Sequence, residues 1–353
     1  MSKQELCWLD CDPGTDDAFA IVLAAYSERI KLIGISSVVG NQTIEKTTNN
    51  VLKVMNLAGL ITQPTLSRNC IDLSQQLKLE DSMSHGGMAC PVLKGCSRPL
   101  FRDAIIFDMI FGDSGLDTHS SIEFPKIPDT ALDYFNNINS HPTHFTTLMF
   151  DYFKSFYPKK ITIIAIGPLT NIALLLMNHP GVSDYIERIV LMGGAMGLGN
   201  TTPASEFNIF GDPHAATRVF NSNLEIFMVP LEITHTTLVT ESVLDRIRTL
   251  KSNFSKIMIE FLLFFQSTVK EFSNMADPPL HDPCAVAFVI DSSMFEYKLI
   301  RVDVETNDTL SLGRIGRTIC DVCDTSKKTK NVNVCLKINV DKFWSLMVEA
   351  LEK

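Results

Sequence analysis

Residues 8–19 read Trp8-Leu9-Asp10-Cys11-Asp12-Pro13-Gly14-Thr15-Asp16-Asp17-Ala18-Phe19, and this stretch decides the fold. The apolar residues that lead into it predict a short buried strand, and the apolar run over residues 18–26 is long enough for a buried helix. Pro13-Gly14 marks the turn between them. The acidic residues therefore lie where a strand ends and a helix begins, which is the edge of an open α/β sheet at which ligand sites form.

The four carboxylates of this stretch indicate a bound cation. Carboxylates this close raise each other's pKa, so the ionisation of several together implies compensating positive charge. Oxygen ligands suit Ca²⁺ or Mg²⁺, and the stretch holds no Cys/His pair at zinc spacing. A bound ion also helps a water molecule to lose its proton, which points to a hydrolase. A single acid such as Asp16 or Asp17 could instead cap the helix.

Two other acidic motifs do not fit the same letters. An EF-hand loop starting at Asp10 needs Gly at its sixth position and Glu at its twelfth, where this chain has Thr15 and Ile21. A haloacid-dehalogenase phosphatase begins Asp-x-Asp-x-Thr/Val, and Gly14 stands at the last of these positions. A metal-dependent phosphatase therefore remains only as a rival hypothesis.

The composition is that of a globular protein. Of 353 residues, 45% are hydrophobic and 20% are charged, and the formal net charge of −9 argues against a nucleic-acid or acidic-membrane partner. The nine cysteines are scattered and odd in number, so we expect them to be reduced. The N-terminus has no signal-peptide core, and no apolar run reaches the length of a membrane span. We expect a cytoplasmic protein.

Strands and helices alternate along most of the chain, which is typical of a doubly wound sheet. Strands are expected near residues 31–39, 160–166, 188–192, 224–231, 298–304 and 332–338, and helices near 44–58, 147–156, 170–177, 254–265, 285–290 and 343–351. We predict one α/β domain over residues 1–353, with an open, mostly parallel, Rossmann-like sheet and helices on both faces. Residues 61–94 are interpreted as an irregular insertion, and the tract from Pro125 to Pro142 as further irregular chain.

The opening stretch resembles the fingerprint of the inosine-uridine preferring nucleoside hydrolase family, Asp-x-Asp-Pro-Gly-x-Asp-Asp-Ala, without a gap. Later segments resemble the same family in the same order over roughly residues 5–59 and 95–350. These segments are Val39-Gly40-Asn41-Gln42-Thr43, Ile166-Gly167-Pro168-Leu169-Thr170-Asn171, Met192-Gly193-Gly194 through Glu206-Phe207-Asn208, and His281-Asp282-Pro283-Cys284-Ala285.

The resemblance implies Ca²⁺-dependent hydrolysis of the N-glycosidic bond of ribonucleosides to ribose and free base, in nucleoside salvage. It implies a small-molecule nucleoside substrate and a homodimer or homotetramer. The implied calcium ligands are Asp12, Asp17, Asp282 and the carbonyl of Ile166, and Asp12 also accepts the proton of the attacking water. The implied ribose ligands are Asp16, Asn41, Glu206 and Asn208, with Asn200 on the 5′ side. Asp10 is given a supporting role behind the ion.

The side of the site that faces the departing base is less well defined. His281 is the candidate acid that protonates the base, since an imidazole can donate near neutral pH. Met109 and Phe111 stand where many members have His, and Asn274 stands where many have Tyr. The two tryptophans, Trp8 in the first expected strand and Trp344 in the last helix, lie outside the motifs, so we do not expect the base to stack on Trp as it does in purine-specific members. We expect purine nucleosides such as inosine and guanosine among the substrates. A pyrimidine-preferring hydrolase and a catalytically weak nucleoside-binding protein are the alternatives.

Overall fold

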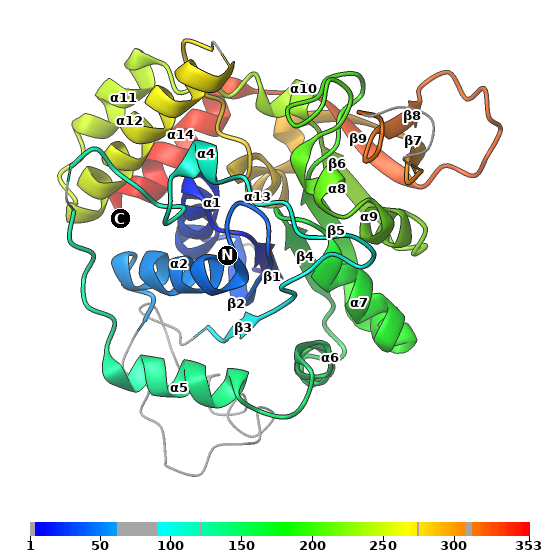
Figure 1. The fold of residues 1–353 in the computed structure, drawn as a ribbon, viewed down its shortest axis with the longest axis horizontal. Coiled ribbons are helices and arrows are strands. Elements are labelled where there is room, and N and C mark those ends of the chain that lie inside the picture. The colour runs from blue at the N-terminus through cyan, green and yellow to red at the C-terminus, as the bar shows by residue number, and fades with distance from the viewer. Residues whose placement is uncertain (1–3, 62–89, 121, 274, 308–312) are drawn as a thin grey trace.

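A nine-stranded mixed sheet forms the centre of the computed structural model, which describes residues 4–61, 90–120, 122–273, 275–307 and 313–353 (Figure 1). The strand order is β3-β2-β1-β4-β5-β6-β9-β7-β8. All pairs are parallel except β7 with β9 and β8 with β7, so the antiparallel strands lie at one edge. The strands are β1 (Glu5–Cys11), β2 (Ile30–Ser37), β3 (Val92–Lys94), β4 (Ile161–Ala165), β5 (Ile186–Met192), β6 (Ile226–Val229), β7 (Phe295–Val304), β8 (Thr318–Asp321) and β9 (Val332–Ile338).

Helices cover both faces of the sheet because the central strands are apolar on both sides. Along β1, Leu9 and Cys11 belong to one buried cluster and Trp8 to the other. The first cluster is covered by α1 (Thr15–Tyr26), α2 (Ile44–Leu57), α11 (Glu241–Arg248), α12 (Asn253–Ser273), α13 (Pro283–Ile290) and α14 (Val340–Glu352). The second is covered by α6 (Phe145–Ser155), α7 (Thr170–Asn178) and α9 (Pro213–Phe220). Figure 1 shows α11, α12 and α14 grouped together, apart from α7 and α9. The expected doubly wound α/β fold is confirmed.

The chain reverses its direction of winding at β1. It runs from β1 outward through β2 to β3, and then returns to β4 on the other side of β1. The carboxyl ends of β1 and β4 therefore flank the switch point of the sheet, where open α/β folds bind their ligands. The acidic stretch follows β1 at this position, and α1 begins at Thr15, so that Asp16 and Asp17 lie in its first turn.

Two segments that the sequence analysis took as irregular are ordered elements. Residues 92–94, at the end of the expected insertion, form β3 and pair with β2. Within the tract from Pro125 to Pro142, α5 spans Asp129–Asn139. Ala131 and Ile138 are buried on one side of this helix, and the prolines flank it rather than interrupt it. Residues 62–89 of the expected insertion lie outside the described residues.

Short helices complete the architecture around the sheet edge. They are α4 (Asp108–Phe111), α8 (Phe207–Gly211) and α10 (Leu231–Thr234). Among the described residues, no helix combines the length and the apolar character that a membrane span needs.

Candidate functional site

Acidic side chains from three parts of the chain meet at the switch point. Ligand oxygens of Asp16, Asp17 and Asp282 lie within 4.8 Å of one another. Asp16 and Asp17 belong to the first turn of α1. Asp282 immediately precedes α13, a helix that packs against α1. All three side chains are buried, as is Asp12 in the loop after β1. The packing of α1 against α13 therefore gathers four carboxylates, of which Asp282 lies 265 residues or more from each of the others in the sequence.

Asp17 combines a capping role with its place in this cluster. Its Oδ2 accepts hydrogen bonds from Gly14 N at 2.9 Å and from Asn41 Nδ2 at 3.2 Å, and its Oδ1 accepts from Asp12 N at 3.1 Å. Carboxylates at the start of a helix satisfy free N–H groups and interact favourably with the helix dipole. The structure therefore shows Asp17 in the capping role, and its role as a metal ligand stays a prediction.

Several carboxylate oxygens of the cluster lack a hydrogen-bond partner. Among the described residues, Asp12 Oδ1 and Asp16 Oδ1 are buried and have none, while Asp12 Oδ2 accepts from Asn41 N at 2.7 Å. Burial, followed by the charge of Asp17, raises the pKa of Asp12 well above its usual value and that of Asp16 to about 8. Burial, followed by the charges of Asp16, Asp17 and Asp12, raises the pKa of Asp282 in the same way.

These observations fit a hard divalent cation. Four buried carboxylates repel one another when ionised, and a doubly charged ion removes that cost. The donor set consists of oxygen atoms only, which suits Ca²⁺ or Mg²⁺. The tightest group contains Asp16, assigned to ribose by resemblance, beside the expected ligands Asp17 and Asp282. Asp12 borders the group with its unpartnered Oδ1.

The remaining expected ligand, the carbonyl of Ile166, lies directly after β4 and beside Asp10. Ile166 N donates to Asp10 O at 2.8 Å, which ties the chain after β4 to β1. Its carbonyl oxygen accepts from Asn208 Nδ2 at 2.9 Å, and Met192 O accepts from the same group at 3.1 Å. The expected metal ligand and the expected ribose ligand Asn208 are thus in direct contact.

Glu206 is fixed by backbone amides at the start of α8. Its Oε1 accepts from Asn208 N at 2.8 Å, and its Oε2 accepts from Gly194 N at 2.8 Å and from Ile209 N at 3.2 Å. Burial raises the pKa of Glu206 to about 7 despite these donors. Asn200 is exposed, and its Oδ1 accepts from Phe207 N at 2.9 Å. Glu206, Asn208 and Asn200 therefore share one rigid segment that follows β5.

Asp10 lies inside β1 and is held by a buried polar network. Its Oδ1 accepts from Ser36 Oγ and, at 2.8 Å, from Asn171 Nδ2. Asn171 Oδ1 in turn accepts from Cys96 N at 2.8 Å, and Ser36 Oγ accepts from Trp8 Nε1 at 2.8 Å. Burial raises the pKa of Asp10 to about 7. This carboxyl group joins β1, β2 and the N-terminus of α7 behind the acidic cluster.

His281, the candidate acid, is a neutral imidazole in this environment. Its Nδ1 lies 2.7 Å from Thr234 Oγ1, and its ring centroid lies 5.6 Å from that of His235. Burial, followed by the charge of His235, lowers the pKa of His281 to about 3. A neutral imidazole donates through one ring N–H, and the hydrogen bond at the other nitrogen selects which one. The contact with Thr234, which is 47 residues away in sequence, has no signal in the sequence.

The aromatic ring of Phe111 covers the turn that carries the acidic residues. A Cβ added to Gly14 would meet Phe111 at 2.9 Å and Asn41 Nδ2 at 3.1 Å, so this close approach requires glycine. Phe111 stacks on Phe265 of α12, with centroids 5.4 Å apart and an interplanar angle of 17°. Met109 points outward with 56% of its surface exposed, and Asn274 lies outside the described residues.

The chain is similar to known proteins over nearly its whole length. The family model described as inosine-uridine preferring nucleoside hydrolase matches residues 7–71 and 72–345. A probable ribonucleoside hydrolase of Dictyostelium discoideum is 40% identical over 365 residues, covering 100% of this chain and 96% of that protein. A pyrimidine-specific ribonucleoside hydrolase of Shewanella oneidensis is 36% identical over 346 residues, covering 97% and 95%. The solved structure of a purine-preferring ribonucleoside hydrolase from Gardnerella vaginalis has a TM-score of 0.79 at 27% identity, covering 99% of this chain and 98% of that one.

Proposed function

The chain belongs to the inosine-uridine preferring nucleoside hydrolase family and is a nucleoside hydrolase, and from this premise we propose that it is Ca²⁺-dependent and that its substrates include purine ribonucleosides such as inosine and guanosine. The observation that supports the metal dependence is the buried group formed by Asp16, Asp17 and Asp282. The positive charge of the cation offsets the repulsion between these buried carboxylates. Ca²⁺ suits a site of carboxylate and carbonyl oxygens that come from separate elements.

Asp12 is the residue that we assign to proton transfer. A divalent cation, when bound, lowers the pKa of the attacking water and orients it. The unpartnered Asp12 Oδ1 is available to accept the proton of that water, whereas Oδ2 stays on Asn41 N. Positioned proton acceptors of this kind contribute about 10²- to 10⁴-fold to rate.

The segment after β5 supplies the ribose site. Cleavage of an N-glycosidic bond gives C1′ oxocarbenium character, which nearby carboxylates stabilise. Glu206 is fixed by three amides and Asn208 by two carbonyls, so neither side chain has to be ordered when the ribose hydroxyls bind. Asn200 and Asp16 complete the proposed set with Asn41.

The proposed purine preference depends on the base-facing side of the site. The buried Phe111 ring stacks on Phe265 and lies against Gly14, and an aromatic ring at this position would favour a large aromatic base. The neutral imidazole of His281 can donate a hydrogen bond, rather than a proton, to the departing base through its ring N–H. The name of the Shewanella oneidensis relative favours the alternative, a pyrimidine preference.

A chromatographic screen tests these proposals. Inosine, guanosine, adenosine, uridine and cytidine are incubated with the protein in Ca²⁺ and in excess chelator, and the free base is quantified. We expect ribose and free base with Ca²⁺, loss of activity with chelator, and the highest kcat/KM for a purine nucleoside.

The results separate the proposals from one another. Equal rates with and without chelator would contradict the metal dependence, and a higher kcat/KM for uridine would contradict the purine preference. Release of phosphate from nucleotides without base release would favour the phosphatase. Saturable calorimetric binding of a nucleoside that stays intact after long incubation would indicate a nucleoside-binding protein.

A further inference from the structure

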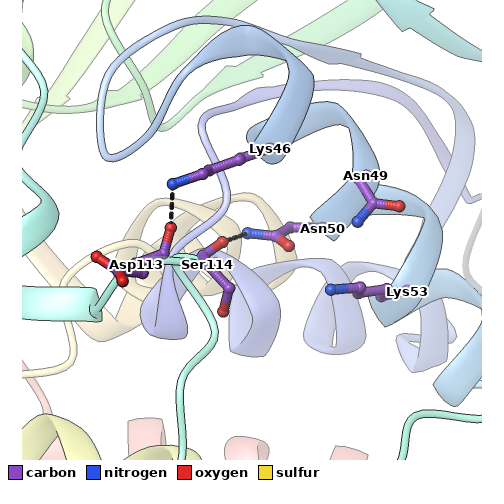
Figure 2. A pocket seen from close by; sticks show the side chains of 6 residues that line it. All are labelled: Lys46, Asn49, Asn50, Lys53, Asp113 and Ser114. Carbon is purple, nitrogen blue, oxygen red and sulfur yellow. Dashed lines mark hydrogen bonds between the residues drawn. The ribbon is translucent and has the colours of Figure 1, made fainter.

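A polar pocket lies between α2 and the turn that follows α4. It is lined by Lys46, Asn49, Asn50, Lys53, Asp113 and Ser114, none of which belongs to the acidic cluster (Figure 2). Figure 2 shows the side chains of Lys46 and Asn50 reaching across to the turn, each with a hydrogen bond. The pocket therefore lies where α2, a helix that covers the sheet, contacts the turn over residues 112–117. We call residues 112–117 the base-side turn.

Asn50 contacts two segments at once. Its Nδ2 donates to Ser114 O in the base-side turn at 2.7 Å and to Pro13 O in the acidic loop at 3.1 Å. The side chain is 1% exposed. A carboxamide nitrogen has two hydrogens, so one group satisfies both carbonyls. Asn50 is therefore a bridge between the loop that carries Asp12 and the turn that follows Phe111.

The base-side turn packs so closely on Asn50 that its residue 115 has to be glycine. A Cβ added to Gly115 would lie 2.8 Å from Asn50 Nδ2 and 3.2 Å from Pro13 O, and Gly115 has a φ of +84°. Only glycine accommodates both the contact and the backbone conformation without strain. Gln42 Nε2 also donates to Gly112 O at 2.9 Å, and Lys46 donates to Asp113 O. Gln42, just before α2, and two residues of α2 thus hold three successive carbonyls of the turn.

The short helix α4, which leads into the base-side turn, is fixed to α12. Thr268 Oγ1 donates to Ile110 O at 2.7 Å, and Phe111 stacks on Phe265. Phe111 in turn covers Gly14, the residue after Pro13. The acidic loop therefore touches this region twice, through the Phe111 ring and through the Asn50 amide.

We propose that Asn50 is a positioning residue that couples the acidic loop to the base-side turn, so that the catalytic carboxylate Asp12 and the base-facing ring of Phe111 keep a fixed relative placement. The catalytic part of this inference rests on the proposed function. Loss of the bridge releases both segments together: the Pro13 carbonyl loses its donor, and so does the Ser114 carbonyl. The positions of Asp12 and Phe111 relative to each other then vary between molecules. This variation lowers the rate of cleavage and the discrimination between bases.

Hydrogen exchange of the metal-free protein tests the coupling without any turnover. The variants are Asn50→Ala, which removes the donors, and Asn50→Asp, which places a carboxylate against two carbonyls. Asn49→Ala and Asn49→Asp are the matched controls, since Asn49 is exposed, adjacent and lines the same pocket. In the Asn50 variants we expect exchange to rise at least about tenfold in peptides covering both residues 12–18 and 110–117, because an opening cost lower by 1.4 kcal/mol corresponds to tenfold. The controls should match the wild type.

Exchange that rises in only one of the two segments, or equally in the Asn49 controls, would overturn the proposal. If Asn50→Asp does not fold, Asn50→Ala carries the comparison, because it introduces no charge.

A second readout separates positioning from a general loss of stability. We expect the ratio of kcat/KM for inosine to that for uridine to change at least threefold in Asn50→Ala and to stay constant in Asn49→Ala. An equal loss on both nucleosides would overturn the positioning role. Absence of cleavage by the wild-type protein would contradict the proposed function, and the exchange experiment would still decide whether Asn50 couples the two segments.

Discussion

Single side chains in the acidic loop carry more than one task, and their burial explains why. Asp12 divides its two oxygens between a backbone amide and an unpartnered position, and Asp17 divides its own between three donors. A buried carboxylate that keeps an unpartnered oxygen is costly unless a ligand uses it. At this scale the structure makes predictions about Asp12 and Phe111.

Asp12→Asn should lower kcat by about 10²- to 10⁴-fold, because an amide cannot accept the proton of the attacking water. The amide oxygen can still accept from Asn41 N, so the fold should be preserved. Steady-state kinetics on inosine measure the loss, and circular dichroism checks the fold. Asp184→Asn is the control, since Asp184 is exposed. Full activity of Asp12→Asn with metal bound would exclude Asp12 as the base.

Phe111→Leu should remove the aromatic surface beside Gly14 while keeping an apolar side chain against Phe265. Loss of one stacked pair costs about 0.5–1.5 kcal/mol, which denaturant titration can detect. We also expect kcat/KM to fall more for inosine than for uridine. A proportional decrease for both substrates would show that the ring does not select the base.

Among the elements, α10 positions the segment that leads to Asn200. Glu232 of α10 accepts from three successive amides, Met196 N at 2.9 Å, Gly197 N at 2.8 Å and Leu198 N at 3.1 Å. Leu231 N donates to Gly194 O at 3.0 Å, and Gly194 N donates to Glu206. The carboxylates of Glu206 and Glu232 therefore hold the segment between β5 and Asn200. No sequence motif indicated the role of Glu232.

Glu232→Ala should destabilise this segment. Each hydrogen bond to a charged group contributes about 1.5–3 kcal/mol, and the partly exposed position of Glu232 places the expected loss near the lower end. Denaturant titration measures the loss, and hydrogen exchange should rise at residues 196–198. Glu232→Gln keeps an acceptor oxygen and should lose less. Glu225→Ala, at an exposed position, should change neither quantity.

In the whole molecule, the acidic cluster joins elements from opposite ends of the chain. Asp17 lies in the first turn of α1, Asp282 immediately precedes α13, and these two helices pack side by side on one face of the sheet. Four buried carboxylates oppose this packing when they are ionised. A cation bound there, as proposed above, would therefore stabilise the fold as well as the reaction.

Addition of Ca²⁺ to chelator-treated protein should raise the melting temperature. A ligand that binds only the folded state stabilises it by about 2.7 kcal/mol at a free concentration of 100 times Kd. Asp17→Asn should show a smaller Ca²⁺-induced shift, and the shift is the quantity to compare because the substitution also weakens the cap at Gly14. Differential scanning calorimetry with and without Ca²⁺ gives both values. An unchanged shift in Asp17→Asn would argue against Asp17 as a ligand.

Several features could be predicted from the sequence because they depend on local order. The apolar strand, the Pro13-Gly14 turn and the apolar helix around the acids predict a strand-turn-helix unit, and their repetition predicts the doubly wound sheet. The same local patterns failed at α5, because the tract from Pro125 to Pro142 was interpreted as irregular chain, and at β3, which has three residues and gains its pairing from β2.

Only the tertiary structure decided which acidic residues and which neighbouring side chains come into contact. Asp282 joins Asp16 and Asp17 because α13 packs against α1, and Phe111 covers Gly14 because α12 holds its ring. The bridge made by Asn50 joins residues that lie 37 and 64 positions away. Sequence periodicity reports which face of an element is buried, whereas contacts between distant elements depend on the crossing of strands and helices in space. The acidic stretch and the repeated strand-helix pattern around it therefore determined the type of fold and the kind of site, and the packing of α2, α12 and α13 determined which atoms meet there.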